Sequence, residues 1–251
     1  MTNPTLRIIS AGAAQGLVRS LEMEFVTTHA NVSLSCSFGA VGAMKEIFLQ
    51  SLDGVDPAMN PTCDVMISSK VILDQLTEMG HLLPESRVDL GLVSTGLARP
   101  SDASEGPSNA QASKSHDLAH VLQTCSAFYV PDTEHSTAGI HLKKVIERLG
   151  LWAEVQHKIK SFPNGALAMK QLAEDRLPGA WGSTQKTEIL YTPGVTWMGT
   201  LPSEHALDTL YQAALCPKGH HLELAKAFLN LLTHPEHQAH RERSGFESPK
   251  A

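Results

Sequence analysis

Leu6-Arg-Ile-Ile-Ser-Ala-Gly-Ala-Ala-Gln-Gly16 is a short apolar run that ends in small residues and passes directly into a helical pattern. A second stretch, Ser37-Phe-Gly-Ala-Val-Gly-Ala-Met44, has the same design. Small residues between a strand and a helix leave the backbone N–H groups at the helix N-terminus open, and the helix dipole favours an anion there. We therefore expect the two turns, feeding one sheet, to form a cradle for a small anion.

Strand-like and helical segments alternate along the chain. Apolar residues recur at helical spacing after each predicted strand, for example Leu17, Val18, Leu21 and Phe25 after the first. The predicted strands are 6–10, 32–36, 64–68 and 126–130. Alternation at this interval predicts βαβ units, a parallel sheet and right-handed crossovers, so the expected fold class is α/β.

Two extended segments, near 84–98 and 186–195, are expected to divide the chain into two α/β halves. One lobe would comprise residues 1–84 with 195–251, and the other residues 85–194. Residues 101–116 are rich in Ser, Ala, Gly and Pro, which predicts an exposed loop with no core to bury.

Composition excludes several classes of protein. With 251 residues, 42% of them hydrophobic and 18% charged, the chain is long enough for two lobes with separate cores. A formal net charge of −6 without a Lys/Arg cluster argues against a nucleic-acid partner. No apolar run approaches the roughly 18 residues that predict a membrane span.

Location and redox state follow from the N-terminus and the cysteines. The chain opens Met-Thr-Asn-Pro, without the basic-then-apolar pattern of an export signal, which predicts a cytoplasmic protein. A periplasmic location is the alternative if a signal has been removed. The four cysteines stand singly, without the two-residue spacing of a zinc or redox motif, so we expect free buried thiols.

The order of these segments resembles the type 2 periplasmic-binding-protein family, in particular its molybdate-binding branch. Besides the two opening stretches, the segments that carry the resemblance are Asp64-Val-Met-Ile-Ser68, Ser136-Thr-Ala-Gly139 followed by Glu147-Arg-Leu-Gly-Leu-Trp152, and His234-Pro-Glu before Gly245-Phe246. The resemblance implies two Rossmann-like lobes, a ligand in the cleft between them, and closure about a hinge.

The chain departs from the molybdate binders where those proteins hold their oxyanion. The resemblance implies serine hydroxyls at the positions of Ala13 and Val41, and a tyrosine at that of Trp181. Loss of two hydroxyl donors disfavours a tetrahedral oxyanion, whereas an organic acid with an apolar carbon skeleton suits such walls. The resemblance extends to aconitate isomerases, which implies an isomerase that shifts the double bond of a small unsaturated di- or tricarboxylate. We expect a monomer.

Such a reaction needs a base for a proton α to a carboxylate, and donors for the developing charge. His135 is the candidate base, because a nearby helix N-terminus favours the neutral imidazole. Glu188 is a second candidate base or acid. The alternatives are an exposed loop histidine and a hinge salt bridge.

The expected ligand-binding residues lie at or near predicted strand ends and turns. They are Ser10, Gly12, Ala13, Val41, Gly42, Ser69, Ala138, Asn164, Trp181 and Gln185. Local roles remain open for several of them, such as helix capping for Asn164 and core packing for Trp181.

Two other functions are compatible with the same fold. A non-catalytic solute receptor for a small anion would feed an ABC-type permease and would require export, and a sensor would signal its closure to a separate partner. His234, His237 and His240 repeat every three residues, but no carboxylate spacing completes a known metal site. We expect a solvated helix face there, and neither a metal nor a cofactor.

Overall fold

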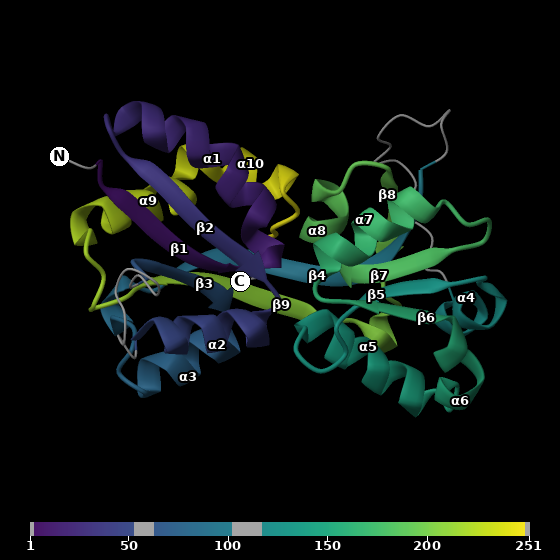
Figure 1. Ribbon diagram of the computed structural model, residues 1–251. Coiled ribbons are helices and arrows are strands. Elements are labelled where there is room, and N and C mark those ends of the chain that lie inside the picture. Colours follow the sequence, from purple (N-terminus) through teal and green to yellow (C-terminus); the bar gives the residue numbers. More distant parts are fainter. Residues whose placement is uncertain (1–2, 53–62, 102–116, 249–251) are drawn as a thin grey trace. The chain divides into compact units, whose positions relative to one another are not determined.

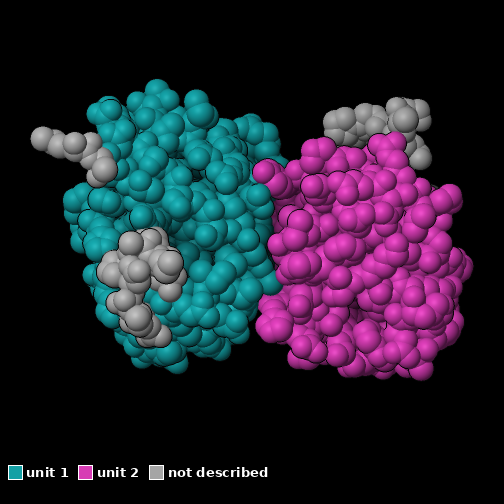
Figure 2. Space-filling view, viewed as in Figure 1, with its two compact units in different colours: residues 1–92, 209–251 teal, residues 93–208 magenta. Residues whose placement is uncertain are grey.

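The computed structural model describes residues 3–52, 63–101 and 117–248. The chain divides into two compact units, Met1–Leu92 with Thr209–Ala251 and Val93–Asp208 (Figure 2). We call these unit 1 and unit 2. Apart from Ser101, the loop predicted at 101–116 lies outside the described residues.

Unit 1 is built on a sheet with the strand order β2-β1-β3-β9. Its strands are β1 (Thr5–Ala11), β2 (Ser33–Gly39), β3 (Val65–Ser69) and β9 (Asp208–Leu215). β1 runs parallel to β2 and β3, whereas β9 runs antiparallel to β3. The order β2-β1-β3 requires each connection to cross over a face of the sheet, which is what the helices do.

Helices cover both faces of the unit 1 sheet (Figure 1). One face carries α1 (Gln15–Thr28), α9 (Leu222–Thr233) and α10 (Gln238–Arg243), and the other carries α2 (Val41–Leu52) and α3 (Lys70–Glu78). On the α1 side, the rings of Phe25 and Phe228 meet edge to face with centroids 5.2 Å apart. On the α2 side, Met44, Phe48 and Leu73 pack into one buried cluster.

The strands of unit 2 form a mixed array, which we call the unit 2 sheet. They are β5 (Phe128–Pro131), β6 (Ile159–Phe162), β7 (Trp181–Gln185), β8 (Val195–Thr200) and, from Val93 onwards, β4 (Val88–Pro100). β5 runs parallel to β6 and β7, and β4 runs antiparallel to β7 and β8. The helices are α4 (Leu118–Thr124), α5 (Thr137–Arg148), α6 (Trp152–Val155), α7 (Gly165–Asp175) and α8 (Lys186–Tyr191).

The two faces of the unit 2 sheet bury separate apolar clusters. Leu97 and Val130 pack with residues of α4, α5 and α6, whereas Ala98 and Tyr129 pack with residues of α7 and α8. This alternation follows from the period of two in a strand. The α/β prediction is confirmed, and each of the four predicted strands is present.

The second predicted extended segment is wrong in part. Residues 186–191 form α8, because Ile189 is buried and the Glu188 carboxylate accepts a hydrogen bond from the N–H of the N-cap residue Gln185. Val195–Thr200 pairs with β4, so it lies in unit 2, and the units divide at 92/93 and 208/209. The divisions predicted from the sequence are 84/85 and 194/195.

The four cysteines are free thiols, as predicted. Cys63, Cys125 and Cys216 are buried and Cys36 is half-buried, and burial raises the pKa of each thiol. Within the described ranges, no helix combines the length and the apolar character that a membrane crossing requires.

Candidate functional site

The carboxyl ends of β1, β2 and β3 meet at one edge of the unit 1 sheet, because the three strands are parallel. Ala11 is in register with Gly39, and Ser10 with Ile67. Each strand then passes into a helix: α1 follows a 3-10 turn, while α2 and α3 begin within two residues of their strands. Three helix N-termini therefore lie at this edge, where they favour anions.

The predicted residues of unit 1 contribute mainly backbone and small apolar groups. The structure brings to this edge Gly12, Ala13, Val41, Gly42 and Ser69. Ala13 and Val41 are buried. Ser69 is 5% exposed and stands at the N-cap of α3, yet its side chain makes no capping hydrogen bond. The Ser10 hydroxyl is fully buried and donates to the Ala11 carbonyl at 2.9 Å, so its role is local.

A pair of cations near this edge was missed by the sequence reasoning. Lys70, the first residue of α3, has its Nζ 2.8 Å from Asp74 Oδ2, and Arg87 Nη2 lies 2.7 Å from Asp74 Oδ1. Arg87 also donates to Gln212, which is in register with Ser68. Hydrogen bonds from Lys70 and Arg87 lower the pKa of Asp74. The signal in the sequence is a lysine two residues after the end of a predicted strand.

The carboxyl ends of β5, β6 and β7 form a corresponding edge in unit 2. Pro131 is in register with Phe162, and Tyr129 with Gly182. The strands lead to α5, α7 and α8 respectively. Ser136, at the N-cap of α5, makes no capping hydrogen bond, and Ala138 lies buried in the first turn.

His135 lies in the turn before α5, where Asp132 holds it. Asp132 Oδ1 accepts from the Glu134 amide at 2.7 Å and the His135 amide at 2.8 Å, and it lies 3.2 Å from His135 Nδ1. Burial alone would raise the pKa of Asp132, but these hydrogen bonds outweigh it and the pKa is lowered. The His135 side chain is 49% exposed. A carboxylate on Nδ1 leaves Nε2 as the nitrogen that faces away, which is the arrangement of an oriented general base.

The sequence reasoning did not include Asp132. Its signal was an aspartate three residues before a histidine in a predicted turn, because Asp side chains accept hydrogen bonds from the amides that follow them.

Glu188 is buried, and its carboxylate is surrounded by donors. Thr184 Oγ1 donates to Oε2 at 2.5 Å, and the backbone N–H groups of Gln185, Ala166 and Gly165 donate to the same carboxylate. Burial, the largest effect, raises the pKa of Glu188 in spite of these donors. A Cβ on Gly165 would lie 2.0 Å from Glu188 Oε2, so the carboxylate needs a glycine at that position.

Two buried hydroxyls lie on the α5 side of the unit 2 sheet. Thr95 is in register with Gln185 and Leu97 with Ser183, so Thr95, Ser183 and Gln185 share the face on which Leu97 packs. Thr95 Oγ1 and Ser183 Oγ have no hydrogen-bond partner within the described part of the chain. An unsatisfied buried hydroxyl costs about 1–3 kcal/mol. The pair therefore indicates a place where a ligand or water supplies the missing bond.

Two of the predicted ligand-binding residues, Asn164 and Trp181, contact other residues of unit 2. Asn164 caps α7, because its Oδ1 accepts from the Leu167 amide at 2.9 Å. Trp181 starts β7, in register with Phe128, the first residue of β5, so it lies at the amino end of these strands. Trp181 and Gln185 are four positions apart along the strand, a distance of ~13 Å. The Trp181 ring instead faces Arg99, whose guanidinium carbon is 5.4 Å from the ring centroid.

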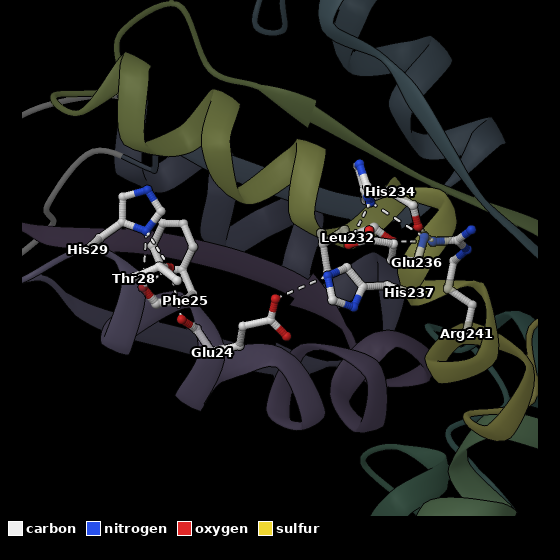
Figure 3. Close-up of polar contacts among 9 residues, drawn as sticks. All are labelled: Glu24, Phe25, Thr28, His29, Leu232, His234, Glu236, His237 and Arg241. Atoms are coloured by element: carbon white, nitrogen blue, oxygen red, sulfur yellow. Dashed lines mark hydrogen bonds and ion pairs between the residues drawn. The ribbon is translucent and has the colours of Figure 1, made fainter.

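The histidine series near the C-terminus is not the solvated face that was predicted. His237 is buried, its side chain being 11% exposed, and its Nε2 lies 3.2 Å from Glu24 Oε1 on α1 (Figure 3). His234 and His240 are half-buried beside it, with ring centroids 6.2 Å and 5.6 Å from that of His237. The prediction fails because this segment packs against α1. Among the described residues, no group of three or more His, Cys, Asp or Glu side chains is arranged to hold a metal.

Comparisons with known proteins agree with the resemblance drawn from the sequence. A family model described as "Bacterial extracellular solute-binding protein" matches residues 6–247. A Pseudomonas protein named aconitate isomerase is 24% identical over 97% of this chain and 87% of its own length. The molybdate-binding protein ModA of Escherichia coli (strain K12) is 30% identical, over 47% of this chain and 44% of its own.

Solved structures share the fold. The periplasmic molybdate-binding protein of Azotobacter vinelandii superposes with a TM-score of 0.74 at 17% identity, covering 98% of this chain and 100% of that one. At this level of identity the likeness concerns the fold alone.

Proposed function

Because the chain belongs to the family of bacterial extracellular solute-binding proteins, we propose that it binds a small organic acid and isomerises it at the carboxyl edge of unit 2. The observation that carries the proposal is the oriented His135. Its Nδ1 is 3.2 Å from Asp132 Oδ1, directly before the N-terminus of α5, and Ser136 leaves that N-terminus without a side-chain cap. A base therefore lies next to a group of donors.

The proposed step moves one proton and one double bond. His135 Nε2 takes a proton from the sp³ carbon next to a carboxylate, and the electron pair of that C–H bond delocalises through the adjacent double bond. The α5 N-terminus, with the hydroxyls of Thr95 and Ser183, stabilises the negative charge on the carboxylate. Return of the proton to the other end of the three-carbon unit shifts the double bond, with no redox change.

The proposed ligand class follows from residues at the unit 1 edge and from one relative. Ala13 and Val41 are buried apolar residues where the resemblance implies hydroxyls, which suits a carbon skeleton better than an inorganic oxyanion. Lys70 and Arg87 supply positive charge near the unit 1 edge. The relative named aconitate isomerase supports a small unsaturated tricarboxylate as the first substrate to test.

The test is proton NMR of the protein with cis- and trans-aconitate in deuterated buffer. We expect interconversion with deuterium incorporation in the wild type, and loss of both in His135→Ala. His157→Ala is the matched control, because His157 is an exposed histidine of the same unit, in the turn before β6. Equal activity of His135→Ala and His157→Ala would contradict the assignment of His135.

A non-catalytic solute-binding protein is the second candidate. The family description and the molybdate-binding relative favour it. In that case a small anion would be bound and passed unchanged to an ABC-type permease, and the protein would be periplasmic; the isomerase would suit the cytoplasm. Acids that raise the melting temperature without taking up deuterium would support the receptor, and cell fractionation would give the location.

A further inference from the structure

Glu188 fills the N-terminus of a helix that would otherwise be open to a ligand. The first two residues of α7, Gly165 and Ala166, donate their N–H groups to the Glu188 carboxylate, and the Leu167 N–H is taken by Asn164. Three of the four N–H groups that a helix leaves without an internal partner are therefore satisfied by the chain itself. α7 retains almost no capacity for an external anion.

The packing at Gly165 shows that the Glu188 carboxylate fits at the start of α7 only because residue 165 has no side chain. The Glu188 side chain is 6% exposed, and both Glu188 Oε2 and Thr184 Oγ1 lie 2.0 Å from where a Cβ of residue 165 would stand. Glu188 is also the third residue of α8 and accepts from the N–H of its N-cap, Gln185. One carboxylate thus joins the starts of α7 and α8.

The start of α5, in the same unit, is different. Its N-cap residue Ser136 makes no side-chain cap, and the buried hydroxyls of Thr95 and Ser183 on the α5 side of the sheet have no partner in the described chain. α5 therefore keeps the capacity for an anion that α7 has lost.

We propose that Glu188 is a specificity-determining residue: an internal anion that occupies the α7 N-terminus, confines the ligand carboxylate in unit 2 to the start of α5, and repels a further ligand charge near α7. The proposal rests on the proposed binding of an organic acid at this edge. It assigns Glu188 a role in positioning and selection in place of proton transfer, because every donor around its carboxylate belongs to the protein.

The first experiment compares ligand charge. Isothermal titration with crotonate, fumarate and cis-aconitate gives the affinity of one, two and three carboxylates for wild type, Glu188→Gln and Glu188→Asp. Glu188→Gln removes the charge and keeps the shape, so we expect the ratio of cis-aconitate to crotonate affinity to rise about tenfold, equivalent to ~1.4 kcal/mol. Glu188→Asp keeps the charge and should keep the wild-type ratio. A purely structural role would weaken all three acids equally in Glu188→Gln, and that result would overturn the proposal.

A second experiment needs no substrate. Glu188→Ala leaves the Gly165 and Ala166 N–H groups without their carboxylate, so formate should raise its melting temperature more than that of the wild type, and neutral formamide should not. If wild type binds none of the three acids, the proposed function fails, and the formate comparison still decides the inference. Equal effects of formate on Glu188→Ala and wild type would refute it.

Discussion

Substitution of Gly165 by alanine tests how tightly the Glu188 carboxylate is held. The added Cβ would lie 2.0 Å from Glu188 Oε2 and 2.0 Å from Thr184 Oγ1, well inside contact distance. The carboxylate must move, and its hydrogen bonds to the start of α7 and to Thr184 weaken together. The backbone at this position is ordinary helix, so conformational strain adds nothing.

The magnitude follows from three contributions to the free energy of unfolding. Forcing a methyl group into a filled site costs ~1–3 kcal/mol. Loss of one hydrogen bond to a charged group costs ~1.5–3 kcal/mol. The better helix propensity of alanine raises the free energy of unfolding by ~1 kcal/mol. We expect Gly165→Ala to destabilise unit 2 by about 3 kcal/mol.

Chemical denaturation of four proteins measures this coupling: wild type, Gly165→Ala, Glu188→Ala and the double variant. Truncation of Glu188 removes the atom that the new methyl group meets and frees Thr184 to rotate. The added cost of Gly165→Ala in the Glu188→Ala background should therefore fall below ~1 kcal/mol. Additive effects, or a single-variant cost below ~1 kcal/mol, would refute the geometry from which the role of Glu188 is argued.

Three other outcomes are expected. Asn164→Ala removes the α7 cap and should lower the free energy of unfolding by ~1 kcal/mol, whereas Asn164→Asp should retain most of it, as chemical denaturation would show. Asp132, whose pKa is lowered in the folded state, contributes stability that is fully present above its unfolded pKa of about 4 and is lost as the pH falls through the folded pKa. Unfolding measured from about pH 6 to 3 should therefore show a steeper loss in wild type than in Asp132→Asn, and parallel curves would contradict it. Phe228→Ala should cost ~3–5 kcal/mol of unit 1 stability in the same assay, because it removes a fully buried ring packed on Phe25; a cost below ~1 kcal/mol would contradict that packing.

The strands and most helices were predictable because their signals are local. Apart from the half-buried Arg7, the residues from Leu6 to Ser10 are buried, so the strand appears in the sequence as a largely apolar segment followed by small residues. α8 was missed because six residues carry too little apolar periodicity to distinguish a short helix from an extended segment. The division between the units was misplaced for a non-local reason, namely the pairing of β8 with β4.

The sequence indicates at which edge of the sheet many of the candidate residues lie, but not which residues they contact. Turns after parallel strands meet at one edge by topology, so Gly12, Val41 and Ser69 could be assigned to one edge without coordinates. The end of β7 at which Trp181 lies depends on where that strand begins, and the structure shows that β7 begins at Trp181 itself. The cap made by Asn164 is a local signal that the sequence carried as an open alternative.

Glu188 shows why residue type and burial do not by themselves identify a catalytic carboxylate. A glutamate three residues after Gln185 carries the half of a capping box that is visible in the sequence, and that half predicts a bond to the Gln185 amide. The bonds to Gly165 and Ala166 join parts of the chain that only the fold brings together. Because those amides belong to the start of α7, the same carboxylate that resembles a base from the sequence removes one anion site from unit 2. In the proposed function the ligand carboxylate then binds at the open N-terminus of α5, next to His135, so the proposed selectivity for ligand charge follows from one buried contact.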